Sequence, residues 1–204
     1  ASAGVINIVT KKPSFERSGY VSSTLGNFNT KKVKSYITGP LNETTAYSLS
    51  ANVHQSDGHT DNVTTGSDMN NRDRFGFRGE LLFQPSDDLS IRLTADYDEY
   101  DETCCAVGST SYGVGNQIQS LMGGRIIPNN VFTQKVFYDF DPETEGDNSG
   151  LSMHIKRDFE GMTLESISAF RNTFSYSVQD VDFDGGSFCL LYTSDAADEW
   201  LRGV

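Results

Sequence analysis

Two neighbouring stretches of the chain decide its fold class: FGFRGELLF at residues 75–83 and IRLTADY at residues 91–97. Every second residue in each stretch is apolar or small, and most of the residues between are polar or charged. A period of two is the pattern of a β-strand whose two faces meet different surroundings. Residues 84–88, QPSDD, separate the stretches and favour a tight turn. The pair therefore predicts a hairpin in an antiparallel sheet.

The same alternation recurs along the chain, whereas amphipathic segments of helical period are nearly absent. The clear cases are residues 47–54 and 151–156, and the weaker ones are residues 19–26, 31–39 and 162–178. Near Ser166 and Ile167 the phase of the pattern changes, which indicates either a β-bulge or small residues on the apolar face. The expected fold class is all-β, with about seven antiparallel strands.

The connections between these strands differ in length. Tight turns are expected at residues 40–44, 85–88 and 158–161, and longer loops fall near 57–71 and 101–149. Short turns should therefore gather at one end of the sheet and long loops at the other. This asymmetry, strands of ~9–11 residues and aromatic side chains near both strand ends are typical of outer-membrane β-barrels. The aromatic residues are Tyr47, Phe83 and Phe159 beside the short turns, and Tyr97, Tyr100, Phe174 and Tyr176 towards the loops.

The composition excludes several classes of protein. The chain has 204 residues, a net charge of −12 and a mean hydropathy of −0.43, and it lacks the run of ~18 apolar residues that a membrane-spanning helix needs. The acidic balance argues against a nucleic-acid partner, because phosphates require a basic patch. The 13 Phe and 9 Tyr residues are too many for a disordered acidic chain. A membrane β-barrel remains, and its alternative is a soluble β-sandwich, such as a secreted adhesin or a carbohydrate-binding module without transport activity.

The two ends of the chain carry separate signals. The first residues lack the basic and apolar regions of a targeting signal, so we expect any such signal to lie upstream or to have been removed. From Cys189 the sequence CLLYTSDAADE resembles the translation of a sequencing adapter. Residues 189–204 are therefore expected to be a non-native tail, and the alternative is a genuine terminal strand followed by a short helix.

Residues 1–13, ASAGVINIVTKKP, resemble the closing segment of the plug in TonB-dependent outer-membrane receptors. In that family a Gly-rich turn leads into an apolar strand ending in Thr-Lys, and the first barrel strand follows. Gly39-Pro40-Leu41 resembles the first periplasmic turn, and residues 73–83 resemble an early barrel strand. The resemblance implies that residues 1–14 end the plug domain. It also implies that residues 15–188 form the N-terminal part of an up-and-down transmembrane β-barrel, about seven of its 22 strands around a plugged lumen.

The resemblance also implies a function without covalent chemistry, so neither an enzyme nor a cofactor is expected. Receptors of this family take up a scarce solute, often a ferric siderophore or a similar iron complex, when TonB pulls on the plug. The implied location is the outer membrane of a Gram-negative bacterium. The implied partners are outer-membrane lipid and lipopolysaccharide, the TonB complex through the plug N-terminus, and a small-molecule iron chelate.

Alternation assigns four charged residues to the inside of such a barrel. Arg78, Glu80, Arg92 and Asp96 occupy the polar positions of the two deciding strands. A charged side chain that faces lipid destabilises a barrel, so these side chains should face the lumen and contact the plug.

Carboxylates crowd the end of the strand at residues 91–100. Asp98, Glu99, Asp101 and Glu102 are candidate contacts for a cation or a ferric ligand, or for a divalent bridge to lipopolysaccharide, since hard cations favour carboxylates. The alternative is a solvated barrel rim.

Cys104 and Cys105 follow at the start of the longest loop. A disulfide is expected in an oxidising location, either between the two or with a cysteine outside this chain, and free thiols are the alternative. A metal site is disfavoured because no His or Cys lies nearby at ligand spacing. Residues 180–185, DVDFDG, match the opening of a calcium loop, but a strand end that alternates Asp with apolar residues is the preferred interpretation. His54, His59 and His154 are scattered and indicate no catalytic group.

Overall fold

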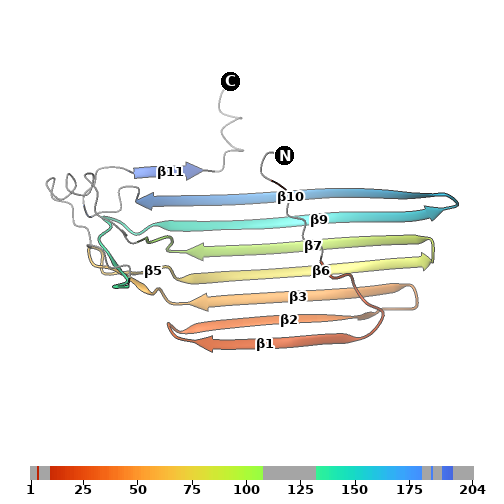
Figure 1. The fold of residues 1–204 in the computed structure, drawn as a ribbon, viewed down its shortest axis with the longest axis horizontal. Helices are drawn as coiled ribbons and strands as arrows, with labels where there is room; N and C mark the ends of the chain where they lie inside the picture. Colours follow the sequence, from red (N-terminus) through yellow and green to blue (C-terminus); the bar gives the residue numbers. More distant parts are fainter. Residues whose placement is uncertain (1–3, 5–9, 108–131, 181–184, 186–189, 195–204) are drawn as a thin grey trace, which may run out of the picture.

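One broad antiparallel sheet makes up most of the computed structural model, which describes residues 4, 10–107, 132–180, 185 and 190–194 (Figure 1). The sheet has eight strands in the order β1-β2-β3-β6-β7-β9-β10-β11, so each strand pairs with the next one of the sheet along the chain. The seven long strands are β1 (Ser18–Gly26), β2 (Thr30–Pro40), β3 (Thr45–Ser56), β6 (Arg72–Ser86), β7 (Leu89–Glu102), β9 (Glu143–Phe159) and β10 (Met162–Asp180). The short strand β11 (Leu190–Ser194) pairs with the end of β10. The predicted all-β class and its seven long antiparallel strands are confirmed.

The sheet is open, because no pairing joins β1 to the strand at the opposite edge among the described residues. Figure 1 shows the strands side by side in a single layer, with the N-terminal segment running across one face. The described residues contain no helix that is long and apolar enough to cross a membrane.

The turns at one end of the sheet are short, as predicted. They join β2 to β3, β6 to β7 and β9 to β10, and all three lie at the right-hand end in Figure 1. Gly161 supports the last of them with a φ of 81°, a left-handed conformation that glycine adopts without steric cost. The opposite end carries the long loops, but also one short connection that the loop pattern did not predict. Residues 27–29 link β1 to β2 there, with Phe28 and Asn29 both at positive φ.

The phase change near Ser166 does not produce a bulge. β9 and β10 pair without a break from Phe159–Met162 to Glu143–Val178. The second interpretation is correct, because Ser166 and Ser168 are small residues that occupy positions on the apolar face. The irregularity in the sheet lies instead between β6 and β7, where the register shifts between Phe83 and Ser86.

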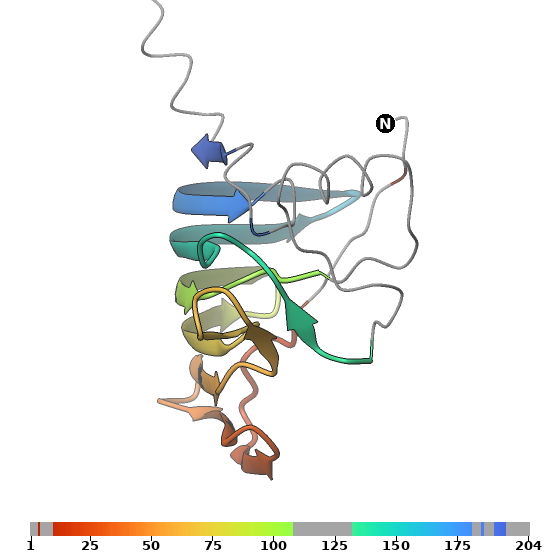
Figure 2. The ribbon, with the colours of Figure 1, turned by 90° about the vertical axis from the view of Figure 1, so that its left-hand side faces the viewer.

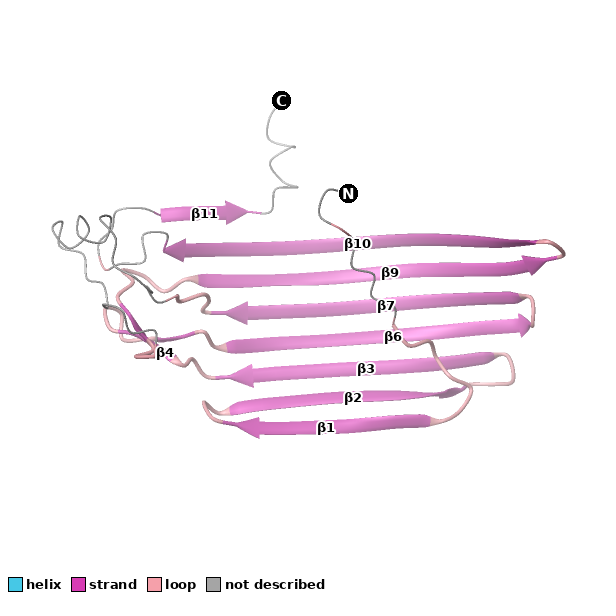
Figure 3. Ribbon diagram, in the orientation of Figure 1, coloured by secondary structure: helices cyan, strands magenta, loops and turns pink. Residues whose placement is uncertain are grey.

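A second, three-stranded sheet lies at the loop end of the main sheet (Figures 2 and 3). Its order is β5-β4-β8, formed by Asp68–Met69, Thr60–Asn62 and Lys135–Val136, and β4 runs parallel to β8. Met69, Val136 and Tyr138 are buried together beneath it. The described parts of the long loops thus form a small sheet with its own buried cluster.

Candidate functional site

The main sheet has one apolar face. Residues directly opposite in neighbouring strands share a face, so the register groups Ile37, Leu49, Gly79, Ala95, Leu151 and Phe170 into one row across six strands. The next row towards the short turns contains Tyr47, Leu81, Leu93, Met153 and Ser168. These side chains are exposed although apolar: Leu49 is 42% accessible, Leu93 45% and Leu151 63%. A soluble protein rarely leaves so wide an apolar surface uncovered.

The charged residues of this face lie only towards the two ends of its strands. On β6 the residues of the face run from Phe83 to Phe75 without a charge, a distance of about 26 Å at ~3.3 Å per residue. The outward apolar band of a transmembrane barrel is ~25 Å tall. On the loop side charges begin in the row of Phe75, where Glu99 of β7 and Asp147 of β9 lie opposite it, and on the turn side they begin at Arg157 of β9.

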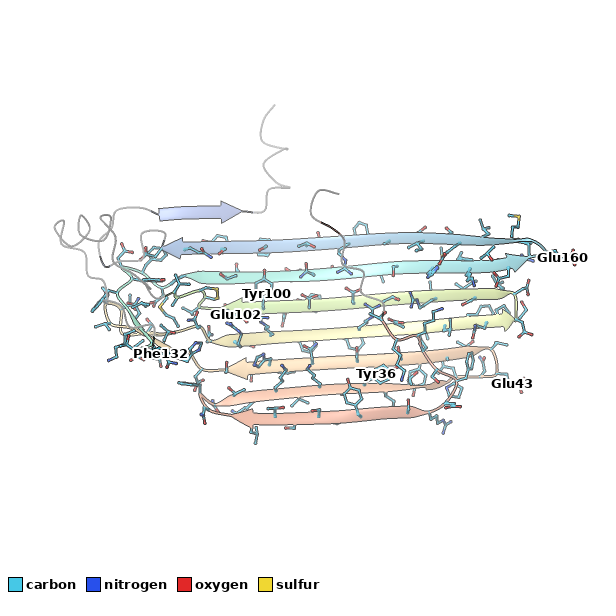
Figure 4. The ribbon with its side chains drawn as sticks, in the orientation of Figure 1. Tyr36, Glu43, Tyr100, Glu102, Phe132 and Glu160 are labelled. Atoms are coloured by element: carbon cyan, nitrogen blue, oxygen red, sulfur yellow. A yellow bond between two sulfur atoms is a disulfide. The ribbon has the colours of Figure 1, made fainter. Side chains whose placement is uncertain are left out.

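Aromatic residues border the apolar band at both ends. Phe75 and Tyr97 lie 6.5 Å apart between ring centroids near the loops, and the guanidinium of Arg157 lies 5.0 Å from the centroid of Phe159 near the turns. Tyr100 does not belong to this border, contrary to the sequence interpretation. Its side chain lies on the opposite, polar face, over Gly146, because the even-numbered residues of β7 alternate with those of the apolar face. Figure 4 labels Tyr100 near the loop end of β7.

The other face is polar and cross-linked by ion pairs. Arg78 Nε lies 2.6 Å from Glu80 Oε1, and Arg171 Nη2 lies 2.8 Å from Asp96 Oδ2. The second pair spans β9, which lies between β7 and β10 in the sheet. Gly150 makes that span possible, because a Cβ there would lie 2.7 Å from Arg171 Nη2. Sequence reasoning missed Arg171 and Gly150, and only the strand register brings them beside Asp96.

The four residues predicted to face a lumen all lie on this polar face. Glu80 is only 4% accessible, and its Oε2 is a buried atom without a hydrogen-bond partner among the described residues. The side chains of Arg78 and Asp96 occupy directly opposed positions of β6 and β7, yet each pairs with a different residue. Their grouping on one face follows from the register, and their contact with a lumen stays a prediction.

The N-terminal segment at residues 10–14 lies against the polar face. Arg78 Nη2 donates a hydrogen bond to Thr10 Oγ1 at 3.2 Å, and the Lys11 ammonium lies 5.9 Å from the ring centroid of Tyr36. The backbone N–H of Ser14 donates to Thr38 Oγ1 at 2.9 Å. Side chains of two strands, β2 and β6, thus hold this segment. Figure 4 shows Tyr36 beside it.

The acidic residues at the end of β7 do not form one group. Glu99 and Asp101 lie on the same side as Phe75 and Tyr97, whereas Asp98 and Glu102 lie on the polar side. Glu102 is already neutralised by Arg72 and Arg74, and Asp98 accepts a hydrogen bond from Asn148 at 2.8 Å. No group of three metal-ligating side chains occurs among the described residues. Successive strand residues point to opposite faces, so the four candidates are divided between the two faces, and contact of any of them with a cation or a ferric ligand stays a prediction.

Asp141 organises the small sheet at the loop end. Its carboxylate accepts hydrogen bonds from Asn62 Nδ2 at 2.9 Å, from Thr65 Oγ1 at 2.7 Å and from the Ser67 hydroxyl. Burial alone would raise the pKa of Asp141, but the three hydrogen bonds outweigh burial and hold that pKa below its usual value. Burial raises the pKa of the neighbouring Tyr138 to about 12.

Cys104 and Cys105 form a disulfide with each other at the start of the long loop. The Cys104 carbonyl accepts a hydrogen bond from Thr144 Oγ1 at 3.0 Å, which ties the loop to β9. Most of the calcium-loop motif, residues 181–184, lies outside the described residues. Of the histidines, His154 lies 2.5 Å from Glu165, and His59 packs against Phe28, so the three are not brought together.

Comparisons with known proteins agree with this geometry. No family model matches the sequence, and no curated protein matches it. The ferric yersiniabactin uptake receptor FyuA from Yersinia pestis superposes with a TM-score of 0.70 at 19% identity, over 90% of this chain and 27% of that one. The closed form of the ferric-catecholate import receptor Fiu from Escherichia coli K12 gives a TM-score of 0.68 at 13% identity, over 87% of this chain and 24% of that one.

The chain spans about a quarter of the length of the solved receptors that it matches. An open sheet that superposes on a β-barrel receptor over most of its own length is a partial barrel. The similarity to TonB-dependent siderophore receptors is thus confirmed at the level of the fold, and the described sheet has the architecture of one part of their barrel wall.

Proposed function

We propose that this chain forms part of an outer-membrane receptor that imports a scarce solute, a ferric siderophore or a similar iron complex, with energy delivered through TonB. The observation that carries the proposal is the contrast between the two faces of one sheet. One face is apolar and exposed, and along β6 it is uncharged over about 26 Å, whereas the other is polar, ion-paired and covered in part by residues 10–14. A barrel wall between lipid and a plugged lumen requires this contrast.

The alternative β-sandwich is disfavoured by the same contrast. A sandwich buries the apolar face of each sheet against a second sheet ~10 Å away. Here the second sheet of the described chain lies at the loop end and is too small to cover that face.

Within this proposal residues 1–14 close the plug, residues 15–188 supply wall strands and residues 189–204 are a non-native tail. The contacts of Thr10, Lys11 and Ser14 with the polar face support the first two assignments. The partners that follow are lipid and lipopolysaccharide on the apolar side, the iron chelate and the rest of the plug on the polar side, and TonB through the plug N-terminus.

Iron uptake tests the proposal directly. A receptor that contains this segment is expressed in a Gram-negative strain lacking its own siderophore receptors, and uptake of radioactive iron is measured with a panel of ferric siderophores. We expect uptake of at least one complex, and loss of that uptake in a strain without TonB or after a protonophore. Uptake of none of them by a receptor that reaches the outer membrane, or uptake that persists without TonB, would contradict the proposal.

A further inference from the structure

All but one of the strand arginines on the polar face form an ion pair with a carboxylate of the same face. Arg72 and Arg74 pair with Glu102, Arg78 pairs with Glu80, and Arg171 pairs with Asp96. Arg92 lies on the same face, opposite Leu82 on one side and His154 on the other. It makes neither a hydrogen bond nor an ion pair with any residue that the structure describes, and its Nη1 is a buried atom. A buried guanidinium N–H without an acceptor is costly, because the cation loses its hydration without compensation.

Arg92 borders a cavity of about 190 Å³ near the short turns. Lys12 of the N-terminal segment, Ser90, His154 and Lys156 line it as well. The cavity thus lies between residues 10–14 and the sheet, with cationic groups contributed from both sides.

Four carboxylates also line this cavity, and three of them are already engaged. Glu165 lies 2.5 Å from His154 Nε2, Asp158 lies 3.6 Å from Lys156 Nζ, and Asp88 lies 3.8 Å from Arg157 Nε. The fourth, Asp87, is exposed in the turn between β6 and β7 and forms no ion pair with Arg92. Arg92 and Lys12 therefore remain as two cations without a carboxylate partner in the described chain.

We infer that Arg92 and Lys12 form a binding site for a small oxyanion, a carboxylate or a phosphate group, in the cavity at the short-turn end of the polar face. The planar fork of a guanidinium matches two oxygens of such an anion, as the fork of Arg74 does with the two oxygens of Glu102 on this face. The Ser90 hydroxyl lines the same cavity and can supply a further donor. The site does not depend on iron import, since it is built from residues of this chain alone.

Side-chain NMR of the arginines tests the site. The full 204-residue chain is labelled with [15N]arginine, folded in detergent micelles and titrated with inorganic phosphate, and separately with acetate, at constant ionic strength. We expect a saturable shift of the Arg92 Nε–H signal with at least one of the two anions. Saturation with phosphate alone indicates a phosphate-bearing ligand, and saturation with acetate alone indicates a carboxylate.

Two variants and a control complete the experiment. Binding to the variants, which lack the Arg92 signal, is measured by isothermal titration calorimetry with the same anions. Arg92→Gln should weaken binding at least about tenfold, the loss expected when a charge-assisted hydrogen bond is removed. Arg92→Lys keeps the charge and should weaken it less, and it also assigns the signal if the Gln variant fails to fold. Arg72→Gln is the control, because Arg72 lies on the polar face at the opposite end of the sheet and does not line the cavity. A linear shift without saturation, an equal shift at Arg72, or unchanged binding in Arg92→Gln would mean an adventitious ion only and would overturn the inference.

Discussion

At the scale of single residues, glycine decides which ion pairs the polar face can form. A Cβ at Gly150 would lie 2.7 Å from Arg171 Nη2 and 3.2 Å from Asp96 Oδ2, so the glycine leaves room for the pair across β9. Gly146 serves Tyr100 in the same way, since a Cβ there would lie 2.5 Å from the phenol oxygen. Glycine inside a strand is otherwise unfavourable, so its presence here is explained by the side chain that crosses it.

Replacing Gly150 by Ala should therefore have opposite effects in two backgrounds. With Arg171 present, we expect a loss of roughly 1 kcal/mol in the free energy of unfolding, because the new methyl group displaces the half-exposed pair. In an Arg171→Gln background the same change should be neutral or stabilising by up to about 0.5 kcal/mol, since Ala costs less chain entropy than Gly. Urea unfolding of the micelle-folded chain measures both values. An equal change in the two backgrounds would refute the role assigned to Gly150.

Asp141 gives a prediction about pH at the same scale. Its pKa is lower in the folded state than the ordinary ~3.9, so its contribution to stability is complete above that value and disappears as the pH falls through the folded pKa. Replacing Asp141 by Ala should reduce the free energy of local opening at pH 7 by about 2 kcal/mol, because the amide of the buried Asn62 and the hydroxyl groups of Thr65 and Ser67 lose a charged acceptor.

Amide hydrogen exchange in the small sheet measures this effect. The N–H groups of Asn62 and Val63, which bond to Ser67 and Val136, should exchange faster in Asp141→Ala, and the difference from the parent protein should shrink at low pH. Asp61→Asn is a suitable control, because Asp61 forms only an exposed pair with Lys135 at 3.9 Å. Unchanged exchange in Asp141→Ala would show that the carboxylate does not hold the sheet.

At the scale of strands, the alternating pattern was sufficient to predict the seven long elements and the short turns at one end. It could not predict what depends on pairing between strands. The Asp96–Arg171 pair joins residues 75 positions apart, and the small sheet is built from segments of two or three residues, too short to show any period. The carboxylates at residues 98–102 are neighbours in the sequence, but the register divides them between the two faces of the sheet, which the count of acidic residues did not predict.

The register of β7 predicts that substitutions at two adjacent residues, Leu93 and Arg92, affect barrel assembly differently. Leu93 lies on the apolar face in line with Leu81 and Met153, and Arg92 lies on the polar face. In a receptor containing this segment, Leu93→Arg should impair barrel assembly, since an arginine on the lipid face costs ~2–4 kcal/mol near the bilayer midplane. Arg92→Ala should leave assembly intact. Heat-modifiable migration in gels reports assembly, and equal tolerance of both variants would refute the register.

At the scale of the whole molecule, the low mean hydropathy of −0.43 and the exposed apolar face are both consequences of a sheet with one polar and one apolar face. The strands are half polar because one face bears ion pairs, and the charges outside that face gather at the sheet ends, as with Asp73, Glu99 and Arg157. Average composition cannot distinguish this arrangement from a soluble protein, whereas the positions of the charges can. The sheet therefore separates into a central uncharged band and two charged margins, which is how a wall placed in a bilayer must be divided.

That division predicts how deep each row lies in a membrane. The single Trp of the chain, Trp200, is first replaced by Phe, and one new Trp is placed at Leu93, at Thr94 or at Asp73. In liposomes whose lipids carry bromine at the middle of the acyl chain, Trp at Leu93 should be quenched strongly and Trp at Asp73 weakly, because Asp73 lies beyond the apolar band. Trp at Thr94 should escape quenching, since that side chain occupies the buried polar face one residue away. Equal quenching at Leu93 and Thr94 would mean that lipid covers both faces, and the sheet would then not be a wall between lipid and a polar interior.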